Sequence, residues 1–210
     1  MTRPLAVLRP EPGNAATAGR IAMLGLVAIR LPLFAVAPVA WRAPDPTGYD
    51  ALLLTSANAL RHGGDELDRL KALPVHAVGA ATARAAADAG FTVRSTGDAG
   101  VTDVMASAGA QRLLHLAGRD RIESGADTIT VYASTPLPVE PDGLAGSVAL
   151  LHSARAAIRL GEVVADRPTV AVAAISRAVA EAAGTGWAAV AVAERPTDGA
   201  LIAAARRLAD

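Results

Sequence analysis

The sequence predicts an α/β fold with two similar parallel-sheet domains, and three observations support this prediction. Short apolar runs alternate with alanine-rich segments of helical period, as in strand–helix–strand units. Within the runs, apolar residues stand at consecutive positions, which is typical of strands covered on both faces. The pattern recurs further along the chain, which indicates that the architecture is present twice.

The apolar runs are the predicted strands, at residues 5–8, 26–29, 51–54, 75–78, 113–116, 148–151, 170–173 and 188–193. Segments with small and apolar residues at helical spacing are the predicted helices, at residues 14–24, 80–90, 102–109, 176–184 and 198–209. The runs that end at Leu54 and Leu151 continue directly into further segments of helical pattern. Each of these two places is predicted to be a strand that turns into a helix.

The internal repeat relates the middle of the chain to its C-terminal part. Residues 50–64, 74–90 and 102–106 match, in order, residues 148–162, 169–184 and 197–201. In this alignment Ser56 corresponds to Ser153, and Thr102-Asp103 corresponds to Thr197-Asp198. The repeat therefore predicts two domains of similar construction.

A second, weaker match links residues 5–13 to 113–121, although the C-terminal half-domain lacks its own copy of this piece. The economical solution is that the N-terminus completes the C-terminal half. The prediction is a discontinuous α/β domain of residues 1–31 plus 137–210, an inserted α/β domain of residues 48–128, and a two-stranded antiparallel β linker of residues 32–47 and 129–136. Ligands favour clefts between domains, so the active-site cleft is predicted between these two.

The charge and composition of the chain argue against several classes of partner. Among the 210 residues, Lys+Arg and Asp+Glu both number 20, so no net field attracts nucleic acid or an anionic membrane. Aromatic residues make up 3% of the chain, which leaves little to stack on bases. The absence of cysteine excludes disulfides, thiolate catalysis and cysteine-based metal sites.

Neither a membrane span nor a signal peptide is predicted. The longest apolar region, residues 24–41, is interrupted by Arg30, Pro32 and Pro38, whereas a spanning helix needs about twenty apolar residues in a row. The N-terminus carries charges and prolines and lacks an apolar core. A cytoplasmic protein is therefore expected, and a periplasmic solute-binding protein is disfavoured.

Four strand-to-helix corners carry the side chains expected to bind ligand. The carboxyl ends of parallel strands meet at one edge of a sheet, where helix N-termini offer N–H groups to anions. For any single corner, a hydroxyl that caps its own helix is the simpler interpretation. Four corners facing one cleft favour a pocket for a ligand with several carboxylates or phosphates. The corner residues are Thr55, Ser56 and Asn58; Gly79 and Thr82; Ser153, Ala154 and Arg155; and Ser176.

Motifs for nucleotide, metal and hydrolase sites are missing from the sequence. It contains no phosphate-binding loop or dinucleotide fingerprint, and the glycine turns at 98–100 and 184–186 do not form one. The four histidines lack metal-ligand spacing, so no metal is predicted. His76 and His115 lie in predicted strands and are expected to be packed, whereas His152, beside Ser153, is left open between packing and ligand contact. No G-x-S-x-G motif surrounds a serine.

Several stretches, taken in order, resemble the uroporphyrinogen-III synthase family. They are 7-VLRPEPGN-14, 50-DALLLTSANAL-60, 74-PVHAVGAATARAAADAGF-91, 112-RLLHLAGRDR-121, 131-VY-132, 149-ALLHSARAA-157, 172-VAAISRAVAEAAG-184 and 194-ERPTDGAL-201. The resemblance implies two α/β domains joined by a two-stranded β-ladder. It also implies a cofactor-free lyase, active as a monomer, that cyclises the linear tetrapyrrole hydroxymethylbilane to uroporphyrinogen III with loss of water and inversion of the last ring.

The resemblance also assigns roles to individual residues. Tyr132 is expected to be catalytic and to assist departure of the hydroxyl, although position alone favours packing of this ring. Binding of the substrate's carboxylates is expected of Thr55, Ser56, Thr82, Ser153, Ser176 and Arg9, together with Asn58, Gly79, Ala154 and Arg155 from the same corners.

The chain departs from the family pattern at two corners. His152-Ser153-Ala154-Arg155 lacks the proline that the family often has after the serine, and residues 174–177 replace a G-x-x-T corner. These departures keep a second interpretation open, in which the chain is a non-catalytic sensor of the same fold that binds a tetrapyrrole or another polycarboxylate.

Overall fold

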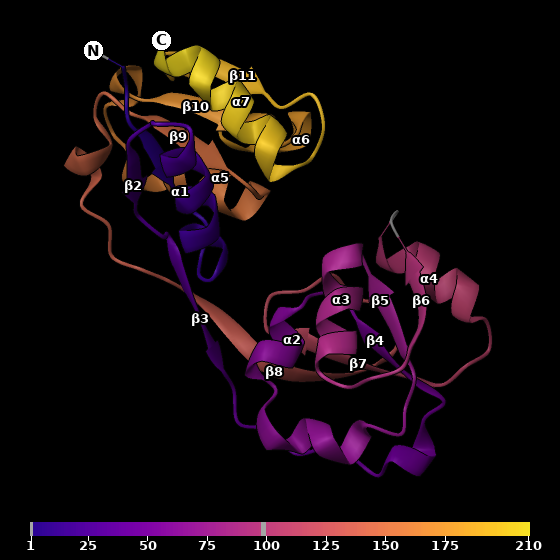
Figure 1. Ribbon diagram of the computed structural model, residues 1–210. Coiled ribbons are helices and arrows are strands. Elements are labelled where there is room, and N and C mark those ends of the chain that lie inside the picture. The colour runs from indigo at the N-terminus through magenta and orange to yellow at the C-terminus, as the bar shows by residue number, and fades with distance from the viewer. Residues whose placement is uncertain (1, 98–99) are drawn as a thin grey trace. The chain divides into compact units, whose positions relative to one another are not determined.

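The computed structural model describes residues 2–97 and 100–210, with the side chains of all of these except residues 141 and 142. The chain divides into two compact units (Figure 1). The first unit comprises residues 1–35 and 136–210, and the second unit comprises residues 36–135. The domain limits expected from the repeat stay a prediction, because compactness alone does not define where a domain ends.

The first unit is built on a five-stranded parallel sheet with the order β11-β10-β9-β1-β2. Helices α1 and α7 cover one face of this sheet, and α5 and α6 cover the other. The strands are β1 (Leu5–Val7), β2 (Ala28–Arg30), β9 (Val148–Leu151), β10 (Ala171–Ala174) and β11 (Val190–Val192). The helices are α1 (Gly13–Met23), α5 (Ala154–Val163), α6 (Arg177–Ala182) and α7 (Asp198–Ala209), with short 3-10 turns at Pro141–Leu144 and Arg167–Thr169.

The second unit is built on a six-stranded sheet with the order β3-β8-β7-β4-β5-β6. Helices α2 and α3 contribute to the core on one face, and α4 contributes to the core on the other. The strands are β3 (Phe34–Pro38), β4 (Ala51–Leu54), β5 (Val75–Val78), β6 (Val93–Gly97), β7 (Leu113–Gly118) and β8 (Asp127–Pro136). The helices are α2 (Asn58–His62), α3 (Ala80–Asp88) and α4 (Val101–Ala108), with 3-10 turns at Pro46–Gly48 and Gly64–Leu70.

The chain passes between the two units in β3 and in β8, which are neighbours in the second sheet. The Val39 N–H donates to the Val131 carbonyl at 3.0 Å, and the Leu137 N–H donates to the Leu33 carbonyl at 2.9 Å. These bonds join residues that run in opposite order along the two segments. The role of the pair as a linker remains a prediction.

The α/β fold class with parallel sheets is confirmed, because β4 pairs in parallel with β5 and β7, and β9 with β1 and β10. The unbroken apolar runs at 51–54 and 148–151 are fully buried strands, as their composition predicts. No helix among the described residues is long and apolar enough to cross a membrane.

One strand is absent from the sequence-based prediction. The segment 93-VRSTG-97 has a single apolar residue, yet it forms β6 at the edge of the second sheet, paired in parallel with β5. Its residues alternate between partly buried and exposed, so the strand is held by backbone pairing more than by burial. Part of the glycine turn predicted at 98–100, residues 98 and 99, lies outside the described residues.

Candidate functional site

A cavity of about 340 Å³ opens in the second unit where β4, β5 and β7 reach their carboxyl ends. This is the edge at which a parallel α/β sheet binds ligands. Side chains from two strand-to-helix corners, from the loop after β7 and from β8 form its walls. The described residues that line it are Thr55, Ser56, Val78, Gly100, Val101, Gly118, Asp120, Arg121, Ile122 and Tyr132.

The Thr55-Ser56 corner places two hydroxyls on the cavity wall. The buried strand β4 ends at Leu54, so the chain leaves the sheet at this point. The Ser56 Oγ accepts a hydrogen bond from the Asn58 N–H at 3.2 Å, and its O–H remains available to donate elsewhere. Asn58 lies outside the cavity lining, and its Oδ1 accepts from the Arg61 guanidinium at 3.1 Å.

Helices α3 and α4 begin directly after glycines, and no side chain of the described residues caps either helix. Gly79 precedes α3 at a φ of 81°, and Gly100 precedes α4 at a φ of 115°, conformations that a side chain would strain. Gly100 and Val101 line the cavity, so the start of α4 borders it. The predicted pair Gly79 and Thr82 lies outside the lining, and the Thr82 side chain is buried.

Tyr132 reaches the cavity because β8 is irregular at this point. Ala117 pairs with Thr130, whereas Gly118 pairs with Tyr132, so Val131 is an additional residue in β8. The bulge places the phenol over Gly118, where a Cβ atom would lie 2.7 Å from the Tyr132 ring and 2.9 Å from its hydroxyl oxygen. Only glycine leaves this space open, so Gly118 determines where the Tyr132 phenol lies.

In the first unit the predicted hydroxyls cap helices. The Ser153 Oγ accepts from the Ala156 N–H at 3.2 Å at the start of α5, and the Ser176 Oγ accepts from the Val179 N–H at 3.4 Å at the start of α6. Thr197 caps α7 in the same way. The capping interpretation is therefore confirmed for Ser153 and Ser176. It leaves each hydroxyl hydrogen for another acceptor, because a cap uses only the oxygen.

Two other predicted residues lie at the same edge of the first sheet, at the start of α5. Ala154 is exposed in the first turn of the helix. The Arg155 guanidinium lies over the Phe34 ring, 4.4 Å from its centroid. Ser153 is itself exposed, so ligands can reach this corner from solvent.

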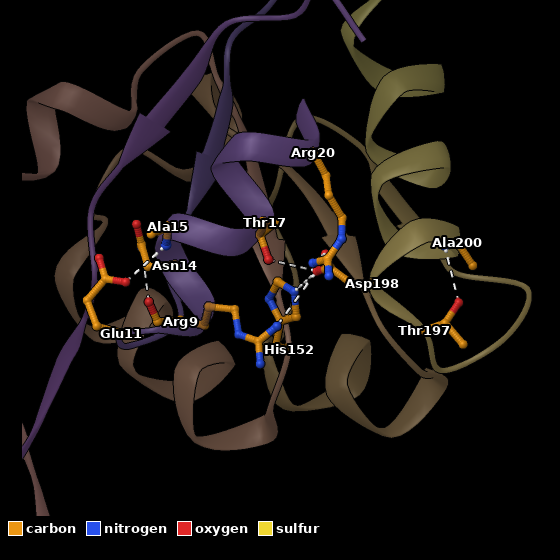
Figure 2. Close-up of polar contacts among 10 residues, drawn as sticks. All are labelled: Arg9, Glu11, Asn14, Ala15, Thr17, Arg20, His152, Thr197, Asp198 and Ala200. Atoms are coloured by element: carbon orange, nitrogen blue, oxygen red, sulfur yellow. Dashed lines mark hydrogen bonds and ion pairs between the residues drawn. The ribbon is translucent and has the colours of Figure 1, made fainter. Parts of the chain in front are cut away.

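Asp198 is the centre of a polar cluster in the first unit (Figure 2). Its carboxylate accepts from the Thr17 hydroxyl at 2.9 Å and from the Arg20 guanidinium at 2.7 Å. The His152 Nε2 lies 2.7 Å from Asp198 Oδ1, and the Arg9 guanidinium lies 3.7 Å from the same oxygen. Three basic side chains thus surround one carboxylate at the N-terminus of α7.

The environment of Asp198 keeps its carboxylate ionised. Burial by itself raises the pKa, but hydrogen bonds from His152 and Thr17, the charge of His152 and a hydrogen bond from Arg20 together lower the pKa to about 2. The His152 side chain, left open between packing and ligand contact in the sequence-based interpretation, is 9% exposed, and its Nε2 contacts Asp198.

Arg9 is held in place by the buried Asn14. The Asn14 Nδ2 donates to the carbonyl of Val7 at 2.7 Å and to the carbonyl of Arg9 at 3.0 Å. The chain after β1 is therefore tied to the first turn of α1. The Arg9 side chain, which is 36% exposed, extends from the segment between β1 and α1 towards Asp198 (Figure 2).

The two strand histidines are packed, as predicted. The His76 ring contacts the Ser95 Oγ at 2.7 Å and the Gln111 Oε1 at 2.9 Å. His115, which is 1% exposed, lies between Thr55 and Ser124. Within the described residues, no three histidine, aspartate or glutamate side chains gather in a way that could hold a metal ion.

The sequence matches the family model of uroporphyrinogen-III synthase HemD over residues 15–203. The chain belongs to the uroporphyrinogen-III synthase family. No curated protein sequence matches it. Members of this family are enzymes of tetrapyrrole and haem biosynthesis, and their substrate is a small tetrapyrrole.

Solved structures of the uroporphyrinogen-III synthase family share the fold. The chain is similar to the uroporphyrinogen-III synthetase of Helicobacter pylori, with a TM-score of 0.72 at 18% identity, covering 98% of this chain and 99% of that one. It is also similar to a mutant uroporphyrinogen III synthase of Thermus thermophilus, with a TM-score of 0.57 at 19% identity, covering 98% of each chain. At these identities the likeness shows the fold alone.

Two features of this uroporphyrinogen-III synthase family member were not predicted from its sequence: the Asp198 cluster and one wall of the cavity. The Asp198 cluster had one signal, because the repeat aligned Thr197-Asp198 with Thr102-Asp103, but nothing indicated that Thr17 and Arg20 would meet it. The wall formed by Gly118 and residues 120–122 had a signal in the stretch 113-LLHLAGRDR-121, which indicated the weaker repeat and the family resemblance but not a cavity wall.

Proposed function

We propose that this chain is a uroporphyrinogen-III synthase. It cyclises hydroxymethylbilane to uroporphyrinogen III, with inversion of the last pyrrole ring and loss of water. The family match over residues 15–203 carries the proposal. We further propose that the enzyme is a lyase that works without a cofactor, as a monomer in the cytoplasm.

The cavity of the second unit supports this proposal by its size and its chemistry. A volume of about 340 Å³ lies at the small end of the range for ligand pockets, so the cavity suits one substituted pyrrole ring rather than a whole tetrapyrrole. Its wall combines the hydroxyls of Thr55 and Ser56 with the Arg121 side chain. Hydroxyl and guanidinium donors suit the acetate and propionate groups of such a ring.

In the proposed reaction, Tyr132 acts on the leaving hydroxyl. The C–O bond of the hydroxymethyl group breaks, the oxygen takes a proton and leaves as water, and the positive charge on the carbon is shared with the pyrrole nitrogen. The Tyr132 phenol, at the cavity wall, donates the hydrogen bond or proton that makes this oxygen a better leaving group. Ring closure then depends mainly on how the substrate is positioned.

Carboxylate binding is proposed for the predicted residues of each unit. In the second unit these are Thr55, Ser56, Asn58, Gly79 and Thr82, of which Thr55 and Ser56 line the cavity. In the first unit they are Arg9, Ser153, Ala154, Arg155 and Ser176. The hydroxyl hydrogens of the two serine caps and the Arg9 guanidinium are the donors that this role requires.

Product analysis tests the proposed function. The purified protein is supplied with hydroxymethylbilane, and the isomers of the cyclised product are separated and quantified. We expect the type III isomer to predominate. If only the symmetric type I isomer forms, at the rate seen without protein, the chain is no synthase; binding of the substrate under those conditions would favour the sensor of the same fold.

Replacement of Tyr132 by phenylalanine tests the role of the phenol. We expect kcat to fall about a hundredfold, the lower end of the effect of a general acid, with KM little changed, because the ring that fills the site is retained. The measurement is steady-state formation of the type III isomer. An unchanged kcat would return Tyr132 to a packing role.

A further inference from the structure

A buried histidine, His115, lies beside the cavity of the second unit and contacts two of the segments around it. His115 lies on β7 with its ring between the Thr55 corner and the loop after β7. The His115 Nε2 is 3.1 Å from Thr55 Oγ1, and the His115 Nδ1 is 3.0 Å from Ser124 Oγ. Thr55 lines the cavity, and Ser124 belongs to the loop whose preceding residues, 120–122, line it too. The ring therefore contacts one residue of the cavity lining, Thr55, and the loop that supplies three others.

The Ser124 contact favours one direction for these hydrogen bonds. The Ser124 Oγ already accepts from the Ala126 N–H at 3.3 Å, which occupies one of its two lone pairs and favours donation of its own O–H to His115 Nδ1. A neutral imidazole has one acceptor nitrogen and one donor nitrogen. If Nδ1 accepts, then Nε2 carries the proton and donates to the Thr55 oxygen.

His115 is neutral under ordinary conditions. Burial of the ring lowers its pKa to about 4, with the Arg121 charge acting in the same direction and the Glu123 charge opposing it. At neutral pH the ring therefore has a single proton, and its two contacts must be one donated and one accepted hydrogen bond.

We propose that His115 is a positioning residue that holds the Thr55 hydroxyl as a donor towards a carboxylate bound in the cavity. Because the Thr55 oxygen accepts from Nε2–H, its hydrogen is directed away from the ring and towards the ligand. The opposite tautomer would make Thr55 donate to the ring and present only lone pairs to the cavity, which would repel a carboxylate. The nature of the ligand rests on the proposed function, whereas the direction of the hydrogen bonds does not.

The tautomer is directly measurable by NMR. The chain has four histidines, so ¹⁵N-histidine labelling gives few ring signals, and the His115→Phe variant identifies those of His115 by their loss. We expect Nε2 to resonate as a protonated nitrogen and Nδ1 as an unprotonated one, with no titration between pH 7.5 and 5.5. A protonated Nδ1, or an imidazolium at pH 7, would overturn the proposal.

Steady-state kinetics test whether substrate binding depends on the direction in which the Thr55 hydroxyl donates. Thr55→Val, which keeps the shape and removes the hydroxyl, is expected to raise KM about tenfold or more, the effect of losing one hydrogen bond to a charged group. Thr55→Ser is expected to restore KM. His115→Phe should raise KM by a similar factor, and adding it to Thr55→Val should change KM little further, because both variants remove the same donor. If the KM of the double variant rose by the product of the two single-variant factors, the proposal would be contradicted.

His76→Phe is the matched control. His76 is also buried in a strand of the same sheet and bonded through both ring nitrogens, but it lies outside the cavity lining. We expect this variant to lose stability without a change in KM. A rise in KM as large as that of His115→Phe would show that any loss of a buried histidine has this effect.

A failure of the proposed function is distinguishable from a failure of this inference. If the protein forms no type III isomer, binding of uroporphyrin III, the oxidised form of the proposed product, replaces KM as the readout and is followed by fluorescence. Weaker binding to Thr55→Val and His115→Phe, together with the Nε2–H tautomer, would support the inference without the enzyme activity. Unchanged binding to both variants would refute it.

Discussion

Gly118→Ala is expected to lower turnover by about the factor that Tyr132→Phe does, although position 118 carries no side chain. A Cβ atom at this position would lie 2.7 Å from the Tyr132 ring, closer than packed atoms approach, so the ring must move. The phenol would then leave the cavity wall, from which it is proposed to act on the substrate. Crowding at such a buried site also costs about 1–3 kcal/mol of stability.

Two double variants separate the crowding from the chemistry. In Tyr132→Phe the ring remains, so Gly118→Ala should still reduce stability there but should not lower kcat further. In Tyr132→Ala the ring is gone, and Gly118→Ala should cost little stability. The measurements are urea unfolding and steady-state kcat. If Gly118→Ala is equally destabilising in the Tyr132→Ala background, the Cβ atom clashes with something other than the ring.

Gly19→Ala is a suitable control for the change from glycine to alanine. Gly19 lies in α1 with open space around its Cβ position, and its φ is not positive. Alanine is favoured over glycine within a helix by roughly 0.5–1 kcal/mol. We therefore expect Gly19→Ala to be neutral or stabilising and to leave turnover unchanged.

Asp198→Ala is expected to reduce the free energy of unfolding by about 3 kcal/mol at pH 7, because the variant removes an acceptor shared by several donors. The carboxylate is 17% exposed in its side chain, and the Thr17 hydroxyl and the Arg20 and His152 side chains all bind to it. Without it, a buried imidazole and a buried hydroxyl lose their partner. Urea unfolding measures the difference, and Asp198→Asn keeps an acceptor oxygen in case the alanine variant does not fold.

The pH profile of stability provides a second measurement on Asp198. The pKa of this carboxyl is about 2 in the folded chain, below its ordinary value of 3.8. The ionised form is therefore favoured by folding. Its contribution is complete above pH 4 and is lost as the pH falls from 4 to 2, amounting to about 2 kcal/mol. The difference in stability between wild type and Asp198→Ala should shrink across this window, and a constant difference would contradict the role of the charge.

Two features keep this measurement specific. His115 has a lowered pKa of about 4, so it reduces stability as the pH falls from about 6.5 to 4, above the Asp198 window. Glu194→Ala removes a carboxylate that is 81% exposed and 3.6 Å from Arg207. Exposed ion pairs contribute roughly 0–1 kcal/mol, so Glu194→Ala should change the free energy of unfolding little at both ends of the Asp198 window.

Local patterns in the sequence were sufficient to predict most of the fold. Runs such as 51–54 and 148–151 are apolar at every position, and only a strand covered on both faces buries all of them. Ser153 and Ser176 each precede an apolar-patterned segment, and both cap a helix. Strand β6 was missed because it is held by pairing with β5, and pairing leaves no periodic pattern in a polar segment.

The functional geometry depends on contacts between segments far apart in the chain. Thr17 and Asp198 are 181 positions apart, and a bond at that separation has no local signature. Tyr132 was predicted to be catalytic from the family resemblance, but its contact with Gly118 depends on a bulge in β8 that shifts its register by one residue. A single-residue shift reverses the direction of a side chain, so the place of the phenol is a property of strand pairing.

At the Thr55 corner, too, local sequence predicted one part of the structure and contacts between distant segments determined the other. An apolar run followed by Thr55 and Ser56 predicted a strand-to-helix junction, because short polar side chains are favoured where helices begin. The hydrogen-bond partner of Thr55 was predicted only as a packed strand residue, since His115 stands 60 positions away and becomes a neighbour when β4 and β7 pair. Residue type is encoded locally, whereas the direction in which a hydroxyl donates is set by the groups that the folded sheet brings beside it.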